Sequence, residues 1–162
     1  NNLLDKVTDN LCKVLSYLGV QGNIYKGYAA PIVYDPEPQP LAHGESGLDG
    51  PVLPKAHIQA STIHAIEFMK QMCEEHDKIT IIALAPLTNI ALFLKTWPEL
   101  QHKIECITFM GGSRYKGNII ERAEFNIYED AHAAKIVFES GVPLIMSGLE
   151  ICEICMTPHI ER

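Results

Sequence analysis

Positive charge is scarce in this chain of 162 residues. Lys and Arg together number 13, whereas Asp and Glu number 20, so the net charge is -7. Proteins that bind nucleic acid neutralise its phosphates with clustered Lys and Arg. We therefore expect no nucleic-acid partner. Long apolar runs are lacking too, since none approaches the roughly 20 residues of a transmembrane helix. We therefore expect no membrane partner.

Cysteine offers little basis for a disulfide framework or a zinc site. The five cysteines are odd in number, and only Cys152 and Cys155 form a Cys-x-x-Cys pair, whereas a zinc ribbon needs two such pairs. Reduced thiols favour a cytoplasmic location. A thioredoxin-like site places such a pair at a helix start after a strand. A redox role therefore stays open as an alternative, although small apolar fillers are the favoured interpretation.

The hydrophobic pattern predicts short buried strands that alternate with helices. Helical spacing of apolar residues predicts helices near residues 4–18, 61–74, 88–95 and 130–138. Apolar runs predict buried strands at 79–85, 104–110 and 144–149, the first of them buried on both faces. This alternation indicates an α/β fold with right-handed βαβ units and a mainly parallel sheet. Residues 29–54, which hold six of the ten prolines, are predicted to form a surface loop.

The most informative stretch runs from residue 110 to residue 130. The strand predicted at 104–110 stops at Gly111-Gly112, and a polar loop follows before the next helix. An α/β enzyme builds a pocket at the carboxyl edge of its sheet in this way. Amides both donate and accept hydrogen bonds, and carboxylates accept them, so the loop suits a ligand with several hydroxyl groups. Its polar side chains are those of Asn118, Glu121, Glu124 and Asn126.

Three blocks of the sequence resemble the inosine-uridine preferring nucleoside hydrolase family. They are ALAPLTN at 83–89, MGG at 110–112 and AEFNIY at 123–128, and HGESGLDG at 43–50 fits the family's loop near the base. Separate blocks in the family order form a far more specific signal than a lone glycine motif. The resemblance implies a Rossmann-like α/β domain, a bound calcium ion and a dimer or tetramer. The implied reaction is hydrolysis of the N-glycosidic bond of purine or pyrimidine ribonucleosides to ribose and free base.

The resemblance assigns the ribose to one group of polar residues. Asn118, Glu124 and Asn126 match the family's ribose-binding side chains, and Asn1 matches a further asparagine that contacts the ribose. Without the resemblance, the first three would be read as members of a solvated loop. The binding energy of their contacts with the ribose would position the sugar for attack by water.

Four other residues receive roles from the same resemblance. Met110 is expected under the ribose, Phe125 beside the site and His43 near the base, although a core Met and an idle surface His remain alternatives. Thr88 matches the residue whose backbone carbonyl is a calcium ligand, and carbonyl oxygens are ligands that calcium accepts. Thr88 could also cap its own helix through the hydroxyl group, and both roles can hold together.

Two parts of the family's site have no match in this sequence. One is a strand followed by an Asp-x-Asp-x-x-x-Asp-Asp run, which supplies the catalytic base and most calcium ligands, and the other is a distant His-Asp pair. We therefore expect no catalytic residue among residues 1–162. We expect this polypeptide alone neither to bind calcium tightly nor to hydrolyse nucleosides.

The two ends of the sequence fit the same interpretation. The sequence opens on a helix with no strand before it and stops one turn after a helix start at Thr157-Pro158. We expect residues 1–162 to be part of a single nucleoside hydrolase-like domain, incomplete at both ends. The alternative is a truncated, non-catalytic protein that is degenerate or acts only in assembly.

Overall fold

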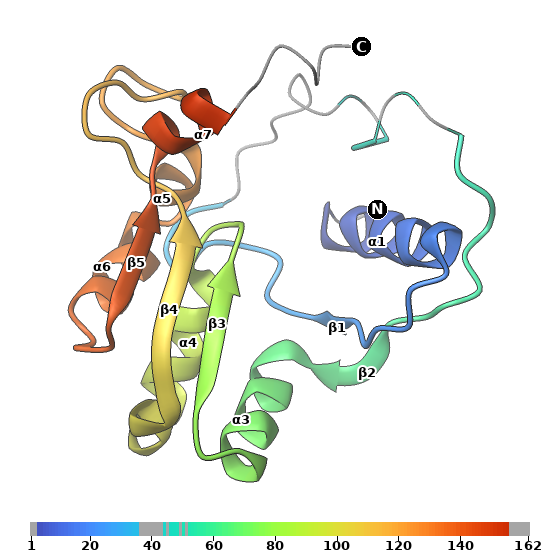
Figure 1. Cartoon of the computed structure of the whole chain (residues 1–162), viewed down its shortest axis with the longest axis horizontal. Helices are drawn as coiled ribbons and strands as arrows, with labels where there is room; N and C mark the ends of the chain where they lie inside the picture. The colour runs from blue at the N-terminus through green and yellow to red at the C-terminus, as the bar shows by residue number, and fades with distance from the viewer. Residues whose placement is uncertain (1–2, 36–43, 45, 49, 51, 156–162) are drawn as a thin grey trace.

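The computed structural model describes residues 3–35, 44, 46–48, 50 and 52–155. Figure 1 shows how the elements of this part of the chain are arranged. They are α1 (Leu3–Leu18), β1 (Tyr25–Lys26), β2 (Ser61–His64), α3 (Ala65–Glu75), β3 (Ile79–Ala83), α4 (Thr88–Thr96), the 3-10 helix η1 (Pro98–Lys103), β4 (Ile104–Met110), α5 (Phe125–Glu129), α6 (Ala131–Phe138), β5 (Leu144–Ser147) and α7 (Leu149–Cys155). Among these helices, none is both long and apolar enough to cross a membrane.

The central element is a parallel sheet of three strands in the order β3-β4-β5. Ile81 of β3 pairs with Ile107 of β4, which in turn pairs with Leu144 of β5. Helix α4 connects the first two strands, and α6 lies in the connection between the last two. The predicted α/β class with a mainly parallel sheet is confirmed. A separate parallel pair, β1-β2, lies beside α3, where Tyr25 stacks on Phe68.

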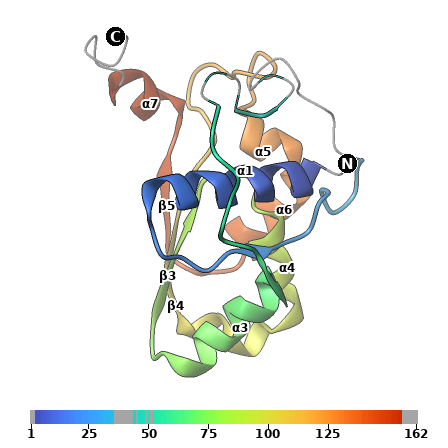
Figure 2. The same ribbon diagram turned by 90° about the vertical axis from the view of Figure 1, so that its right-hand side faces the viewer.

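The core lies between the sheet and the helices on one of its faces. In Figure 2 the three strands stand on one side, and α4 and α6 stand on the other. Phe93 of α4, Ile107 of β4 and Val137 of α6 are fully buried in the same cluster. Ala91 and Ala133 are also fully buried, and their small side chains let α4 and α6 approach closely.

The first strand of this sheet differs from the prediction. The apolar run at 79–85 predicts burial on both faces, but the burial of β3 alternates along its length, and Ile82 is 71% exposed. The reason is that α4 and α6 cover the same face of the sheet (Figure 2). Within the described residues, the opposite face of β3 is therefore open to solvent. The strand also ends at Ala83, two residues earlier than predicted.

Two predicted element boundaries are also wrong. The helix predicted from residue 61 begins only at Ala65, because Ser61–His64 forms β2, which pairs with β1. Thr62 and Ile63 are β-branched and favour extended backbone, and Ile63 is 39% exposed. The strand predicted at 144–149 ends at Ser147, since Leu149 already begins α7.

Candidate functional site

The carboxyl ends of the three central strands meet at one edge of the sheet. Figure 1 shows the three arrowheads pointing to that edge, where α5 and α7 lie. Backbone hydrogen bonds join the segments that leave β4 and β5: the Gly111 N–H donates to the Ser147 carbonyl at 3.1 Å, and the Leu149 N–H donates to the Gly112 carbonyl at 3.1 Å. The long loop after β4 is therefore fixed at its base against the end of β5.

Glu124 lies at the centre of this edge and is almost completely buried, with 2% of its surface exposed. Its Oε1 accepts from the Asn126 N–H at 2.9 Å, and its Oε2 accepts from the Gly112 N–H at 2.9 Å and the Ile127 N–H at 3.2 Å. Glu124 is thus the N-cap of α5 and joins that helix to the glycine turn after β4. Gly112 has φ +75°, a left-handed conformation that glycine adopts without steric cost.

Four other residues assigned by the resemblance lie around Glu124. The Asn126 Nδ2 donates to the Met110 carbonyl at 3.1 Å and lies 3.3 Å from the Met110 Sδ. The Asn118 Oδ1 accepts from the Phe125 N–H at 2.8 Å. Met110, Asn118, Phe125 and Asn126 therefore lie close to Glu124 in the structure. The sequence placed all five on one predicted loop and the strand before it. This group of five is called the β4–α5 cluster below.

Thr88 lies at the start of α4 and is linked to α6. Its hydroxyl donates to the Asp130 Oδ2 at 2.7 Å, and the Asp130 Oδ1 accepts from the Ala133 N–H at 2.9 Å. Asp130 is thus the N-cap of α6, a position that aspartate favours. The alternative role of Thr88 as a cap of its own helix is wrong, because Leu87 is the N-cap residue and no side chain caps α4.

The segment that follows β1 is tied to this same pair of helices. The Asp130 Oδ2 also accepts from the Ile32 N–H at 2.9 Å, and the Asn89 Oδ1 accepts from the Tyr28 N–H at 2.8 Å. Both bonds join residues that lie far apart in the sequence, and neither pairing follows from the sequence pattern. The segment at 28–32 is thus held against the N-termini of α4 and α6.

Other predicted positions do not join the cluster. His43 and Asn1 lie outside the described residues, as do Thr157 and Pro158. Cys152 and Cys155 lie in the last turn of α7, whereas activation of a thiol by a helix requires the N-terminal end. The structure therefore does not favour the redox alternative.

The described residues show no cluster of the side chains that most often bind metal ions. They contain no group of three or more His, Cys, Asp or Glu side chains that could hold a metal ion. A calcium ion takes about six to eight oxygen ligands, and the resemblance assigns one of them to the Thr88 carbonyl. The Asp130 carboxylate, which contacts Thr88, accepts from the Thr88 hydroxyl and from the Ile32 and Ala133 N–H groups.

A second loop contact was not predicted from the sequence. Glu150, in the first turn of α7, accepts through Oε1 from the Arg114 N–H at 2.8 Å, the Ser113 hydroxyl at 3.0 Å and the Tyr115 N–H at 3.2 Å. The pKa of the Glu150 carboxyl is held below its ordinary value, first by its own backbone N–H and then by that of Arg114. Desolvation acts in the opposite direction and is outweighed.

We expect this loop contact to weaken in acid. Because the pKa of Glu150 is lower in the folded chain than in the unfolded chain, the stabilisation is complete above the ordinary Glu pKa. It is lost as the pH falls through the lowered value. Hydrogen exchange of the Arg114 and Tyr115 amides between about pH 3 and 7 measures the effect. Protection that stays constant over that range would contradict it.

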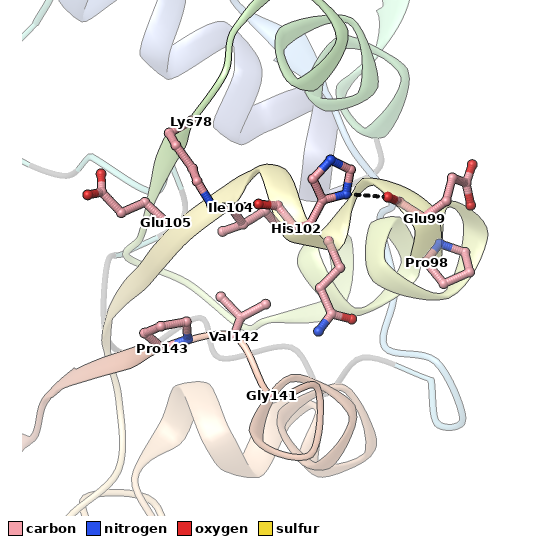
Figure 3. A pocket seen from close by; sticks show the side chains of 10 residues that line it. Lys78, Pro98, Glu99, His102, Ile104, Glu105, Gly141, Val142 and Pro143 are labelled. Carbon is pink, nitrogen blue, oxygen red and sulfur yellow. Dashed lines mark hydrogen bonds between the residues drawn. The ribbon is translucent and has the colours of Figure 1, made fainter.

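A cavity at the opposite edge of the sheet has different surroundings. Figure 3 shows this cavity of about 570 Å³, where Lys78, Ile104 and Pro143 stand at or just before the amino ends of the three strands. Ligands of parallel sheets bind beyond the carboxyl ends of the strands. In addition, no member of the β4–α5 cluster lines the cavity. We therefore place the candidate site at the carboxyl edge.

Comparison with protein families and curated proteins gives one consistent result. The model of the inosine-uridine preferring nucleoside hydrolase family matches residues 1–162. The pyrimidine-specific ribonucleoside hydrolase RihA of Citrobacter koseri is 42% identical over 153 residues, which cover 93% of this chain and 49% of the relative. RihA of Shewanella oneidensis is 42% identical and is matched over 100% of this chain and 52% of its own length. The chain thus spans about half the length of the curated relatives it matches.

Solved structures agree with the fold described above. A purine-preferring ribonucleoside hydrolase from Gardnerella vaginalis superposes with a TM-score of 0.85 at 30% identity, covering 92% of this chain and 50% of that one. A plant nucleoside hydrolase superposes with a TM-score of 0.81 at 27% identity, covering 91% and 48%.

Proposed function

Since the chain belongs to the inosine-uridine preferring nucleoside hydrolase family, we propose that it forms part of an enzyme that hydrolyses ribonucleosides. The proposed reaction cleaves the N-glycosidic bond and releases ribose and the free base. The observation that carries the proposal is the β4–α5 cluster at the carboxyl edge of a parallel sheet, the edge at which such sheets bind ligands. Relatives that share about 42% of its residues are named ribonucleoside hydrolases.

We propose that Asn118, Glu124 and Asn126 hold the ribose hydroxyl groups. Glu124 is fixed by three backbone N–H donors, so its carboxylate would need little reorganisation when a sugar arrives. Oxygen atoms can accept more than one hydrogen bond, which leaves acceptor capacity for a hydroxyl. Such rigid placement lowers the entropy cost of orienting the sugar for attack by water. Met110 and Phe125 would bound the same side of the sugar, and His43 and Asn1 would complete the contacts.

The metal requirement and the assembly of the whole protein are further proposals. We propose that the Thr88 backbone carbonyl is one ligand of a calcium ion and that residues outside the described part of the chain supply the others. A homo-oligomer and a cytoplasmic location are proposed on the same family basis. Residues 1–162 would form part of a single domain.

Pyrimidine ribonucleosides are the proposed preferred substrates. The relatives at 42% identity are named pyrimidine-specific, whereas the purine-preferring structure is 30% identical. Release of uracil from uridine and of hypoxanthine from inosine, measured side by side, tests this preference. A higher kcat/KM for inosine would contradict the pyrimidine preference without affecting the proposal of hydrolysis.

The proposed ribose site is tested by substitution of Asn126 in a version of this chain extended at both ends to the length of its relatives. We expect Asn126→Ala to lower kcat/KM for uridine by roughly 100-fold, because a contact that strengthens in the transition state is lost. Asn23 is exposed and distant in sequence from the loop, so Asn23→Ala is the matched control. We expect its kcat/KM for uridine to be unchanged. Equal activity of the two variants would overturn the assignment.

The same extended protein separates hydrolysis from the non-catalytic alternative. We expect the extended version to release base and to bind calcium, and the 162-residue chain to do neither. Absence of turnover in the extended protein, with calcium bound and the fold intact by circular dichroism, would favour the alternative of a degenerate protein or one that acts only in assembly.

A further inference from the structure

The loop between the glycine turn and Asn118 is held by carboxylates from two different helices. Glu124, at the start of α5, accepts from the Gly112 N–H, and Glu150, at the start of α7, accepts from the Arg114 and Tyr115 N–H groups. The two side chains thus hold backbone donors that lie within four residues of each other. Hydrogen bonds to an ionised acceptor are roughly twice as strong as neutral ones.

The part of the loop held by Glu150 leads directly to Asn118. The Ser113 Oγ lies 3.0 Å from the Glu150 Oε1 and 2.5 Å from the Lys116 carbonyl oxygen, and it accepts from the Lys116 N–H at 3.1 Å. This side chain therefore closes the turn at 113–116. Gly117 follows, and its N–H donates to the Glu121 carbonyl at 2.9 Å. The Asn118 N–H donates to the Ala123 carbonyl at 3.1 Å. The turn at 113–116 therefore sets where the chain enters the segment that orients the Asn118 side chain.

The start of α7 is itself fixed against the same loop. The Leu149 N–H donates to the Gly112 carbonyl, and a Cβ on Gly148 would lie 3.2 Å from that carbonyl oxygen and 2.9 Å from the Glu150 Oε2. Gly148, which has no Cβ, thus leaves room for the Glu150 carboxylate beside the turn after β4. The contact of Glu150 with the loop is therefore part of the packing of β5 and α7 against the turn after β4.

We propose that Glu150 is a positioning residue: it fixes the turn at 113–116 and thereby places Asn118 for contact with the ribose. This inference rests on the proposed function, since it takes Asn118 as a ribose contact. Glu150 acts through the loop backbone and through Asn118. Loss of the Glu150 carboxylate should therefore lower kcat/KM only while Asn118 is present.

The experiment is a double-mutant cycle in the extended protein, with uridine as substrate. We expect Glu150→Ala to lower kcat/KM about 10-fold, and Glu150→Gln, which keeps a neutral acceptor, to recover about half of that loss on a logarithmic scale. In the Asn118→Ala background, Glu150→Ala should cost less than about 2-fold, because the two residues act as one unit. Glu75 is exposed, and Glu75→Ala is the matched control. If the double variant lowers kcat/KM by the product of the two single effects, the proposal is overturned.

A second measurement separates failure of this inference from failure of the proposed function. In the 162-residue chain, Glu150→Ala should speed hydrogen exchange of the Arg114 and Tyr115 amides about 10-fold or more and shift the Asn118 side-chain NH₂ resonances, with the melting temperature nearly unchanged. Unshifted Asn118 resonances would overturn the positioning role, whatever the enzyme does. Absence of turnover in the unsubstituted extended protein would instead count against the proposed function alone.

Discussion

Replacement of Gly117 by alanine should open the segment at 117–123 and remove the proposed nucleoside hydrolysis by the extended protein. A Cβ at position 117 would overlap the backbone oxygens of Ile120 and Ala123 and the backbone nitrogen of Ala123. Backbone atoms cannot swing aside as the end of a flexible side chain can. The segment must therefore change its path to accommodate even one methyl group.

The cost of Gly117→Ala follows from the hydrogen bonds that the new path would break. Gly117, Asn118 and Ile119 donate through their N–H groups within this segment, and Ala123 donates back to Ile120. At about 1 kcal/mol for each bond, the free energy of unfolding should fall by about 2–4 kcal/mol, or the segment should open locally at similar cost. Chemical denaturation measures the first outcome, and hydrogen exchange at 117–119 measures the second.

Gly22 provides the matched control for this prediction. A Cβ at that position would lie 3.6 Å from the Leu15 Cδ1, which is an ordinary contact, and no other heavy atom lies close to it. We therefore expect Gly22→Ala to change stability by no more than a few tenths of a kcal/mol, apart from the gain from a stiffer unfolded chain. Similar behaviour of the two variants would contradict the steric argument.

Local sequence patterns predicted the elements whose formation depends on local chemistry. The bounds of β4 are those predicted from its apolar run, and Asp130 caps α6 as its side chain type predicts. The glycine turn and polar loop after β4 also predicted where the β4–α5 cluster lies, because the carboxyl ends of parallel strands share an edge. These features need no knowledge of distant partners.

Features that depend on distant partners could not be predicted in the same way. Strand β2 exists because Ser61 pairs with Tyr25, 36 positions earlier, while local spacing favoured a helix. No local pattern marks Glu150, yet it contacts a loop 35 to 37 positions earlier. The capping role of Asp130 was visible in the sequence, but its bonds to Ile32 and Thr88 were not. Tertiary contacts override local propensity in each case.

Replacement of Asp130 by alanine is expected to be the most destabilising single change at the carboxyl edge. Only 2% of Asp130 is exposed, and its two oxygens accept from the Ile32 N–H, the Ala133 N–H and the Thr88 hydroxyl. Asp130→Ala would leave the Thr88 hydroxyl and the Ala133 N–H without an acceptor in a buried place, and the part-buried Ile32 N–H would lose its partner as well. Each such loss costs about 1–3 kcal/mol, so we expect the free energy of unfolding to fall by about 3–5 kcal/mol in denaturant titrations. Asp77, whose side chain is exposed, gives the control variant Asp77→Ala, which should be nearly neutral.

Substitution of Thr88 shows whether Asp130 supports the proposed metal ligand or only the two helix ends. Thr88→Val keeps the shape of the side chain and removes the bond to Asp130, so we expect a loss of about 1–2 kcal/mol. In a double-mutant cycle with Asp130→Asn, the coupling between the two positions should reach about 1 kcal/mol, because the residues share one hydrogen bond. Calcium affinity of the extended protein should also fall in Thr88→Val, since the first residue of α4 would be held less firmly. Coupling near zero would mean that Asp130 stabilises α6 and the segment at 28–32 independently of Thr88.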